Sequence, residues 1–224
     1  MDGVSFREAQ RVHRSWLAEP ERKCLVWLAE RTPRWVNPDH LTLLGLLAML
    51  LAGLSYWLAR WHSWALLLVI LWLGVNWLGD SLDGTLARVR RQPRPRYGFY
   101  VDHVVDAFGT AFLVGGLALS GYMSLPVAAG LLIVYLLLCI EVYLATHTLG
   151  TFRLSLAGIS PTELRLLICL GNLAVLARPT VRLLGESYRL YDVAGAIGIA
   201  VMALMLGVDV ARNTLALYRA ERIS

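Results

Sequence analysis

Charged side chains are scarce in this sequence of 224 residues: aspartate, glutamate, lysine and arginine together make up 17% of it, against 57% for hydrophobic residues. The mean hydropathy of +0.57 lies far above that of a soluble domain, so the ordinary soluble classes are excluded. Cysteine is also scarce, and Cys24, Cys139 and Cys169 lack the spacing of a metal site. We interpret all three as packing residues in a reduced environment.

The first forty residues lack the apolar run of a cleavable signal peptide, and the chain has neither an internal repeat nor a low-complexity linker. We therefore expect one domain over residues 1–224. Apolar residues such as Phe6 and Trp16 alternate with arginines near the start, which favours an amphipathic juxtamembrane helix in residues 1–36. A solvated charged helix is the alternative, because the apolar stripe is irregular and Pro20 interrupts it.

Apolar stretches close to the roughly 20 residues that span a bilayer are abundant. Six of them begin at Leu41, Trp64, Ala107, Ser124, Leu166 and Val193, and the fifth is short. The sequence therefore predicts an all-α integral membrane fold in which six transmembrane helices fill residues 37–212, followed by a cytoplasmic tail over residues 213–224.

Positive charge is concentrated on alternate loops. The N-terminal segment, the arginine-rich loop at 88–96 and the tail fall on one side for an even number of spans, and the positive-inside rule makes that side cytoplasmic. We expect both termini to face the cytoplasm, in the inner membrane if the protein is bacterial. The last opposite loop is a partial exception because it holds Arg178, Arg182 and Arg189. The net charge of +5 indicates topology and attraction to anionic lipid, not nucleic-acid binding.

Four aspartates, Asp80, Asp83, Asp102 and Asp106, lie beside or within these apolar stretches. The first two are at i and i+3 of one predicted helix and the other two at i and i+4 of the next, so each pair shares a face. An aspartate at a bilayer centre costs about 2.5–3.5 kcal/mol on insertion scales, and clustered carboxylates repel one another. Bound divalent cations would offset both the insertion cost and the repulsion between carboxylates. Carboxylate oxygens favour magnesium, manganese or calcium over zinc.

The segment between the two pairs contains Pro93, Pro95 and Gly98, which predict a tight connection between antiparallel helices. His103 is expected to point away from the acidic face. Gly84 and Ala87 lie on or near that face, and their small size permits a close approach by another helix or by a flat ligand.

These residues resemble a known motif. The order Asp80-x2-Asp83-Gly84-x2-Ala87-Arg88, then Gly98-x3-Asp102-x3-Asp106, is similar to the pattern D-x2-DG-x2-AR-x8-G-x3-D-x3-D of the CDP-alcohol phosphotransferases. All eight fixed positions match, and the one departure is that nine residues, instead of eight, separate Arg88 from Gly98. The extra residue is expected to lengthen the loop without changing either helical face.

A second likeness lies at the start of the first span, where Pro38-Asp39-His40-Leu41-Thr42 resembles the Pro-Asn-x-x-Thr of relatives. Asp39 replaces the asparagine, and a simple helix start is the alternative interpretation of Pro38 and Thr42.

The resemblance implies a six-helix membrane fold with a cytoplasm-facing site where an alcohol attacks the β-phosphorus of a CDP-linked substrate and CMP leaves. It implies two Mg²⁺ or Mn²⁺ ions on Asp80, Asp83 and Asp102, with Asp106 near a metal and placed as the catalytic proton acceptor. The residues implied in nucleotide or substrate binding are Gly84, Ala87, Arg88, Gly98 and Thr42.

An acceptor-alcohol pocket is expected from polar residues after the fourth span and at the start of the fifth: Glu141, His147, Arg153 and Glu163. Arg165 lies among them. The alternative is an internal ion pair such as Glu163 with Arg153. The expected partners are a CDP-linked lipid or CDP-alcohol, an acceptor alcohol and membrane lipid, with a homodimer as the candidate assembly and no nucleic acid.

Two branches of the family remain open. In one, CDP-diacylglycerol donates a phosphatidyl group to a small polar alcohol, which the short chain favours; in the other, CDP-choline or CDP-ethanolamine donates to diacylglycerol. A cation or proton transporter using the aspartates is the rival from another class, but the other spans offer few polar residues for a path across the membrane.

Overall fold

The computed structural model describes residues 18–149, 160–183 and 185–222. Helices α1 (Ala18–Arg31), α2 (Pro38–Ala59), α3 (Ala65–Val89), α4 (Pro95–Ser120), α5 (Leu125–Leu149) and α6 (Pro161–Ala177) are followed by strands β1 (Thr180–Leu183) and β2 (Glu186–Arg189) and by helix α7 (Leu190–Ala220). The expected helical membrane fold is confirmed. A small antiparallel hairpin, with Thr180 opposite Arg189, is added where we expected only a loop.

Five helices, α2, α3, α4, α5 and α7, are long and apolar enough to cross a membrane within the described part of the chain. The predicted fifth span corresponds to α6, which has 17 residues. At about 1.5 Å per residue it measures about 25 Å, less than the roughly 30 Å of a hydrocarbon core. Within the described residues the structure thus gives five candidate spans, and the predicted fifth span, already short in the sequence, is the shorter helix α6.

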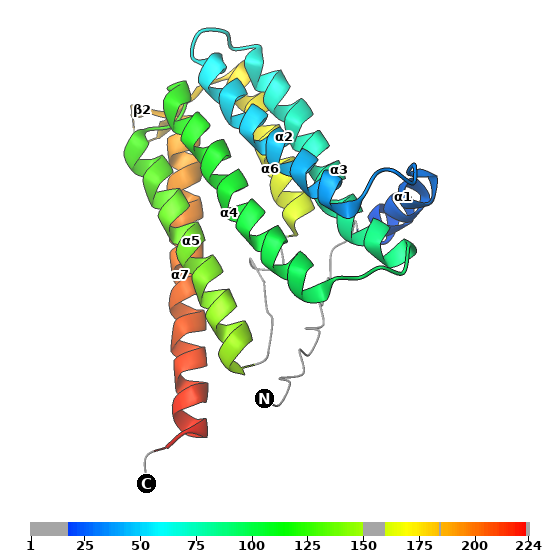
Figure 1. Cartoon of the computed structure of the whole chain (residues 1–224). Coiled ribbons are helices and arrows are strands. Elements are labelled where there is room, and N and C mark those ends of the chain that lie inside the picture. Colours follow the sequence, from blue (N-terminus) through cyan, green and yellow to red (C-terminus); the bar gives the residue numbers. More distant parts are fainter. Residues whose placement is uncertain (1–17, 150–159, 184, 223–224) are drawn as a thin grey trace.

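Helices α3 and α4 both pack closely on α2 and much less on each other. Glycines permit this packing: a Cβ at Gly53 or Gly116 would collide with the backbone of the facing helix, and one at Gly79 would meet the backbone of Leu41 and Gly45. As Figure 1 shows, α5 and α7 run side by side as a second layer, and α7 extends well beyond the α2–α3 pair. Helix α2 is therefore the element that sets the spacing between α3 and α4.

Helix α1 is amphipathic. It buries Leu25 and Ala29 against Leu41 of α2 and Leu86 of α3, and leaves Trp27 52% exposed. Residues 1–17 of the predicted juxtamembrane helix lie outside the described residues. Pro20, which was expected to interrupt the helix, falls in its first turn, where proline is tolerated because no intrahelical N–H bond is lost.

Prolines also begin three other helices. Pro38 is the first residue of α2, Pro95 of α4 and Pro161 of α6. Because α4 begins at Pro95, Gly98 lies inside the helix, and its predicted role as a breaker in the connection is wrong. Helix α3 ends before Arg91, whose φ of 55° is left-handed.

Candidate functional site

The aspartate motif occupies the last turns of α3 and the first turns of α4, as the spacing predicted. The charges of Asp80 and Asp102 act on Asp83, and those of Asp80, Asp83 and Asp102 act on Asp106. The two pairs therefore belong to one electrostatic cluster. The helices that carry the two pairs, α3 and α4, both pack on α2 more than on each other.

Asp83 is the most enclosed of the four aspartates, with 7% of its surface exposed. Thr42 Oγ1 of α2 donates a hydrogen bond to its Oδ2 at 2.7 Å, and the backbone N–H of Gly84 donates to its Oδ1 at 2.5 Å. Both carboxylate oxygens are thus held in place. The resemblance implies a nucleotide contact for Thr42, which stays a prediction; in the structure its hydroxyl contacts a candidate metal ligand.

Asp80 pairs with an arginine from a distant part of the chain. Arg165 Nη2 of α6 donates to Asp80 Oδ2 at 2.5 Å, and Arg165 Nε donates to Asn76 Oδ1 at 2.8 Å. Asn76 in turn donates from Nδ2 to the carbonyl of Gly45 at 3.1 Å. The sequence grouped Arg165 with the start of the fifth span but gave no sign of this pairing. Only the proximity of α6 to α3 reveals it.

His103, which is expected to point away from the acidic face, packs against α5. Its ring lies 4.9 Å from that of Tyr143, and its Nδ1 is 2.5 Å from the carbonyl oxygen of Phe99. These contacts belong to the packing of α4 on α5. Because His103 is used in this packing, the candidate metal ligands in the cluster are carboxylate oxygens, the ligand type that hard divalent cations prefer.

The four carboxylates fit such cations by chemistry, but they do not converge. Among the described residues, no three histidine, cysteine, aspartate or glutamate side chains are arranged closely enough to hold one ion. Asp80 is instead turned to Arg165 and Asp83 to Thr42. Holding a cation requires the carboxylates to move toward one another.

Gly84 and Arg88 form an open surface beside the aspartates. A Cβ at Gly84 would meet only the guanidinium of Arg88, at 3.6 Å, and a Cβ at Gly98 would meet nothing within 4 Å. Arg88 Nη2 donates to Thr85 Oγ1 at 3.0 Å, and both Gly84 and Arg88 are exposed. Helix packing therefore does not explain the missing side chain at Gly84, whereas it does explain Gly53 and Gly79.

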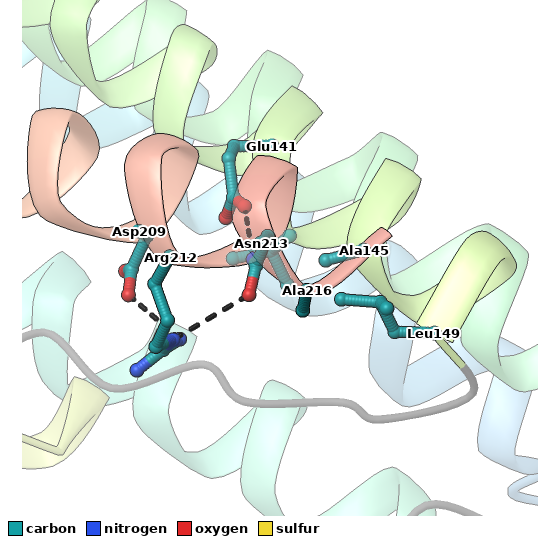
Figure 2. Close-up of a pocket in the computed structure, with 8 residues that line it drawn as sticks. Glu141, Ala145, Leu149, Asp209, Arg212, Asn213 and Ala216 are labelled. Atoms are coloured by element: carbon teal, nitrogen blue, oxygen red, sulfur yellow. Dashed lines mark hydrogen bonds and ion pairs between the residues drawn. The ribbon is translucent and has the colours of Figure 1, made fainter. Parts of the chain in front are cut away.

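The residues proposed for the acceptor pocket are dispersed. Glu141 accepts a hydrogen bond from Asn213 of α7 at 2.6 Å, at a cavity of about 270 Å³ that also contains the ion pair of Asp209 with Arg212 (Figure 2). His147 is exposed near the end of α5. Arg153, and with it the proposed ion pair to Glu163, lies outside the described residues.

Glu163 completes a capping box at the start of α6. Its carboxylate accepts from the backbone N–H of Ser160 at 2.7 Å, while Ser160 Oγ accepts from the N–H of Glu163 at 3.2 Å. The contact fixes the first turn of α6, the helix that carries Arg165.

The loop between α3 and α4 is tied to the start of α2. Arg90 donates to the carbonyls of Thr32, Pro33 and Val36. Arg94 forms an ion pair with Asp39, the second residue of α2. In this chain Asp39 therefore anchors the loop that precedes the second pair of aspartates.

Comparison with known proteins supports the motif. A family model described as CDP-alcohol phosphatidyltransferase matches residues 35–208. Over 186 residues, 77% of this chain, the sequence is 25% identical to Cholinephosphotransferase 1 of Danio rerio and covers 48% of that protein. Over 96 residues, 40% of this chain, it is 34% identical to Cholinephosphotransferase 1 of Gallus gallus and covers 28% of it.

The chain thus spans about half or less of the length of these two curated relatives. The family model, in contrast, covers most of the chain and includes α2, the aspartates of α3 and α4, and Arg165 of α6. The expectation drawn from the eight motif positions is confirmed, and the chain belongs to the CDP-alcohol phosphatidyltransferase family.

Proposed function

We propose that this protein transfers a substituted phosphoryl group from a CDP-linked donor to an alcohol hydroxyl and releases CMP. The observation that carries the proposal is the single electrostatic cluster of Asp80, Asp83, Asp102 and Asp106 beside the open surface at Gly84. Membership of the family supports the same reaction.

The reaction requires one bond to form and one to break. The alcohol oxygen attacks the β-phosphorus, the bond from that phosphorus to the bridging oxygen breaks, and CMP leaves with the bridging oxygen. Asp106 takes the proton of the alcohol.

Other side chains bind and orient. Thr42 and the N–H of Gly84 hold the two oxygens of Asp83 in a fixed direction. The planar guanidinium of Arg88 can donate two hydrogen bonds to a phosphate above Gly84. Gly84 has no side chain and that of Ala87 is small, which leaves room for the nucleotide. Asp80, Asp83, Asp102 and Asp106 would hold two divalent cations, Mg²⁺ or Mn²⁺. These would neutralise the diphosphate and stabilise the leaving phosphate.

Two CDP-linked molecules are candidates for the donor. The first candidate is CDP-diacylglycerol, with a small polar alcohol as acceptor. The second candidate is transfer from CDP-choline or CDP-ethanolamine to diacylglycerol, which is favoured by the names of the two relatives described above, both cholinephosphotransferases.

We also propose that the loop at 88–96 and both termini face the cytoplasm, in the inner membrane if the protein is bacterial, because positive charge accumulates there. A homodimer remains the proposed assembly.

A forward assay separates the two donors. Purified full-length protein in mixed micelles with Mg²⁺ receives either CDP-diacylglycerol with a panel of small polar alcohols, or diacylglycerol with CDP-choline or CDP-ethanolamine, and CMP release is measured. CMP formed in one arm together with the matching lipid product supports the proposal and names the donor. No acceptor-dependent CMP in either arm would overturn it.

A further inference from the structure

The pairing of Asp80 with Arg165 joins the candidate metal site to a helix that carries none of the eight motif positions. The contact is largely removed from water, since the Arg165 side chain is 16% exposed and that of Asp80 is 32% exposed. The guanidinium has a second anchor at 2.8 Å in Asn76 Oδ1, which lies one turn before Asp80 on α3. Arg165 can therefore leave Asp80 and still be held at the edge of the site.

The position of Arg165 is fixed from a third helix. Glu21 Oε1 of α1 accepts hydrogen bonds from Trp77 Nε1 of α3 at 2.7 Å and from Thr162 Oγ1 of α6 at 2.8 Å. Thr162 and Arg165 are three residues apart, as are Trp77 and Asp80, so each helix makes both contacts within one turn. The start of α6 is thus connected to α3 by two sets of hydrogen bonds, one through Glu21 and one through Arg165.

A divalent cation and Arg165 compete for the same carboxylate. Both are positive, and in a partly desolvated site their repulsion is weakly screened. An arginine and a carboxylate paired away from water also leave a costly unpaired charge when one partner is taken. A cation that binds Asp80 is therefore repelled by the guanidinium held on Oδ2, and a guanidinium that moves off Asp80 gains from any anion placed beside Asn76.

We propose that Arg165 is a positioning residue that couples metal binding to nucleotide binding. Without a cation it supplies the countercharge of Asp80. When cation and CDP-linked substrate are both bound, Asn76 retains the guanidinium and Arg165 donates to a phosphate oxygen of the substrate. Metal alone is thus bound weakly, and metal with nucleotide strongly. The identity of the anion, a phosphate of the CDP-linked substrate, rests on the proposed function. The competition between Arg165 and a cation for Asp80 is independent of it.

The test is Mn²⁺ binding to the purified full-length protein, followed by the electron paramagnetic resonance signal of free Mn²⁺, with and without CMP. The variants are Arg165→Met and Arg165→Gln, which remove the positive charge, and Arg165→Lys, which keeps the charge but cannot contact Asp80 and Asn76 through separate nitrogens. Arg182→Met in the exposed hairpin is the matched control, because it removes one positive charge at the other end of α6. Elution volume and thermal unfolding verify that each variant is folded.

Without CMP, the charge-free variants are expected to bind Mn²⁺ tighter than wild type by roughly fivefold or more, while Arg165→Lys and Arg182→Met stay near wild type. CMP is expected to tighten Mn²⁺ binding in wild type by a larger factor than in the Met, Gln or Lys variants. If Arg165 only maintained the fold of the site, the charge-free variants would bind Mn²⁺ more weakly than wild type without CMP, because a disturbed site binds metal more weakly.

Unchanged or weaker Mn²⁺ binding in both charge-free variants overturns the competition. Equal tightening by CMP in wild type and all three variants overturns the coupling. If CMP has no effect on any protein, including wild type, the proposed function fails, while the comparison without CMP still decides whether Arg165 competes for Asp80.

Discussion

Thr42 donates a hydrogen bond to Asp83 Oδ2 at 2.7 Å, and this contact joins the first turns of α2 to the aspartates of α3. The two residues are 41 positions apart. Helix α2 therefore does two things for the site: it sets the spacing between α3 and α4, and it fixes the direction of one candidate metal ligand. Residues that orient metal ligands commonly contribute to metal affinity although they do not touch the metal.

Replacing Thr42 by valine keeps the shape of the side chain and removes the donor. Mn²⁺ affinity is expected to fall by roughly 10–100-fold, the usual effect of losing an orienting hydrogen bond. Thr42→Ser retains the hydroxyl and should stay close to wild type. Calorimetric titration of both variants checks this, and equal affinities for the Val and Ser variants would contradict the positioning role.

Gly84→Leu is expected to weaken CDP-substrate binding and to leave the protein folded. The reason is that a Cβ at Gly84 meets only the flexible end of Arg88, whereas the space above it is assigned to the nucleotide. Gly53→Leu is the contrasting variant, because its Cβ would collide with the backbone of Phe112. Size-exclusion profiles and CMP titrations separate the two; if Gly84→Leu fails to fold as Gly53→Leu does, helix packing explains Gly84 after all.

The aspartates are predicted to have separable roles. Asp106→Asn keeps size and removes the proton acceptor, so turnover should fall by about 10²–10⁴ with a smaller change in substrate affinity. Asp80→Asn, Asp83→Asn and Asp102→Asn should each weaken metal and CDP-substrate binding together. Single-turnover rates and calorimetry on the four variants test this, and Asp106 is not the base if its variant loses binding as fully as Asp80→Asn or turns over normally.

The orientation is testable with single cysteines in a background that lacks Cys24, Cys139 and Cys169. Gln92→Cys lies in the exposed loop between α3 and α4 and is expected to resist an impermeant thiol reagent added outside intact cells. Ser187→Cys in β2 lies on the opposite side and should be labelled. The reverse pattern would invert the topology.

The site was predictable where the information is local. Spacings of three and four residues placed each pair of aspartates on one helical face, and the matching positions from Asp80 to Asp106 indicated the family. The pairing of Arg165 with Asp80 was not predictable, because the two are 85 residues apart and nothing in the local pattern links α6 to α3.

Other differences have equally physical causes. Gly98 was expected to break the chain, but Pro95 starts α4 three residues earlier and a glycine is tolerated within it. The hairpin of β1 and β2 has a left-handed Gly185 at its turn, with φ of 91°. Polar and apolar residues alternate over the four residues of β1 but not over those of β2, so the pattern does not predict a pair of strands.

The central claim is that the aspartates form a metal-dependent site for CDP-linked transfer, and the reverse reaction tests it most directly. Purified protein is incubated with labelled CMP, a lipid extract and Mg²⁺, and the labelled products are identified. The account predicts a labelled CDP compound that is lost in excess EDTA, restored by Mg²⁺ or Mn²⁺, and absent with Asp80→Asn. Formation of no labelled CDP compound by wild type, or its undiminished formation in excess EDTA, would contradict the account.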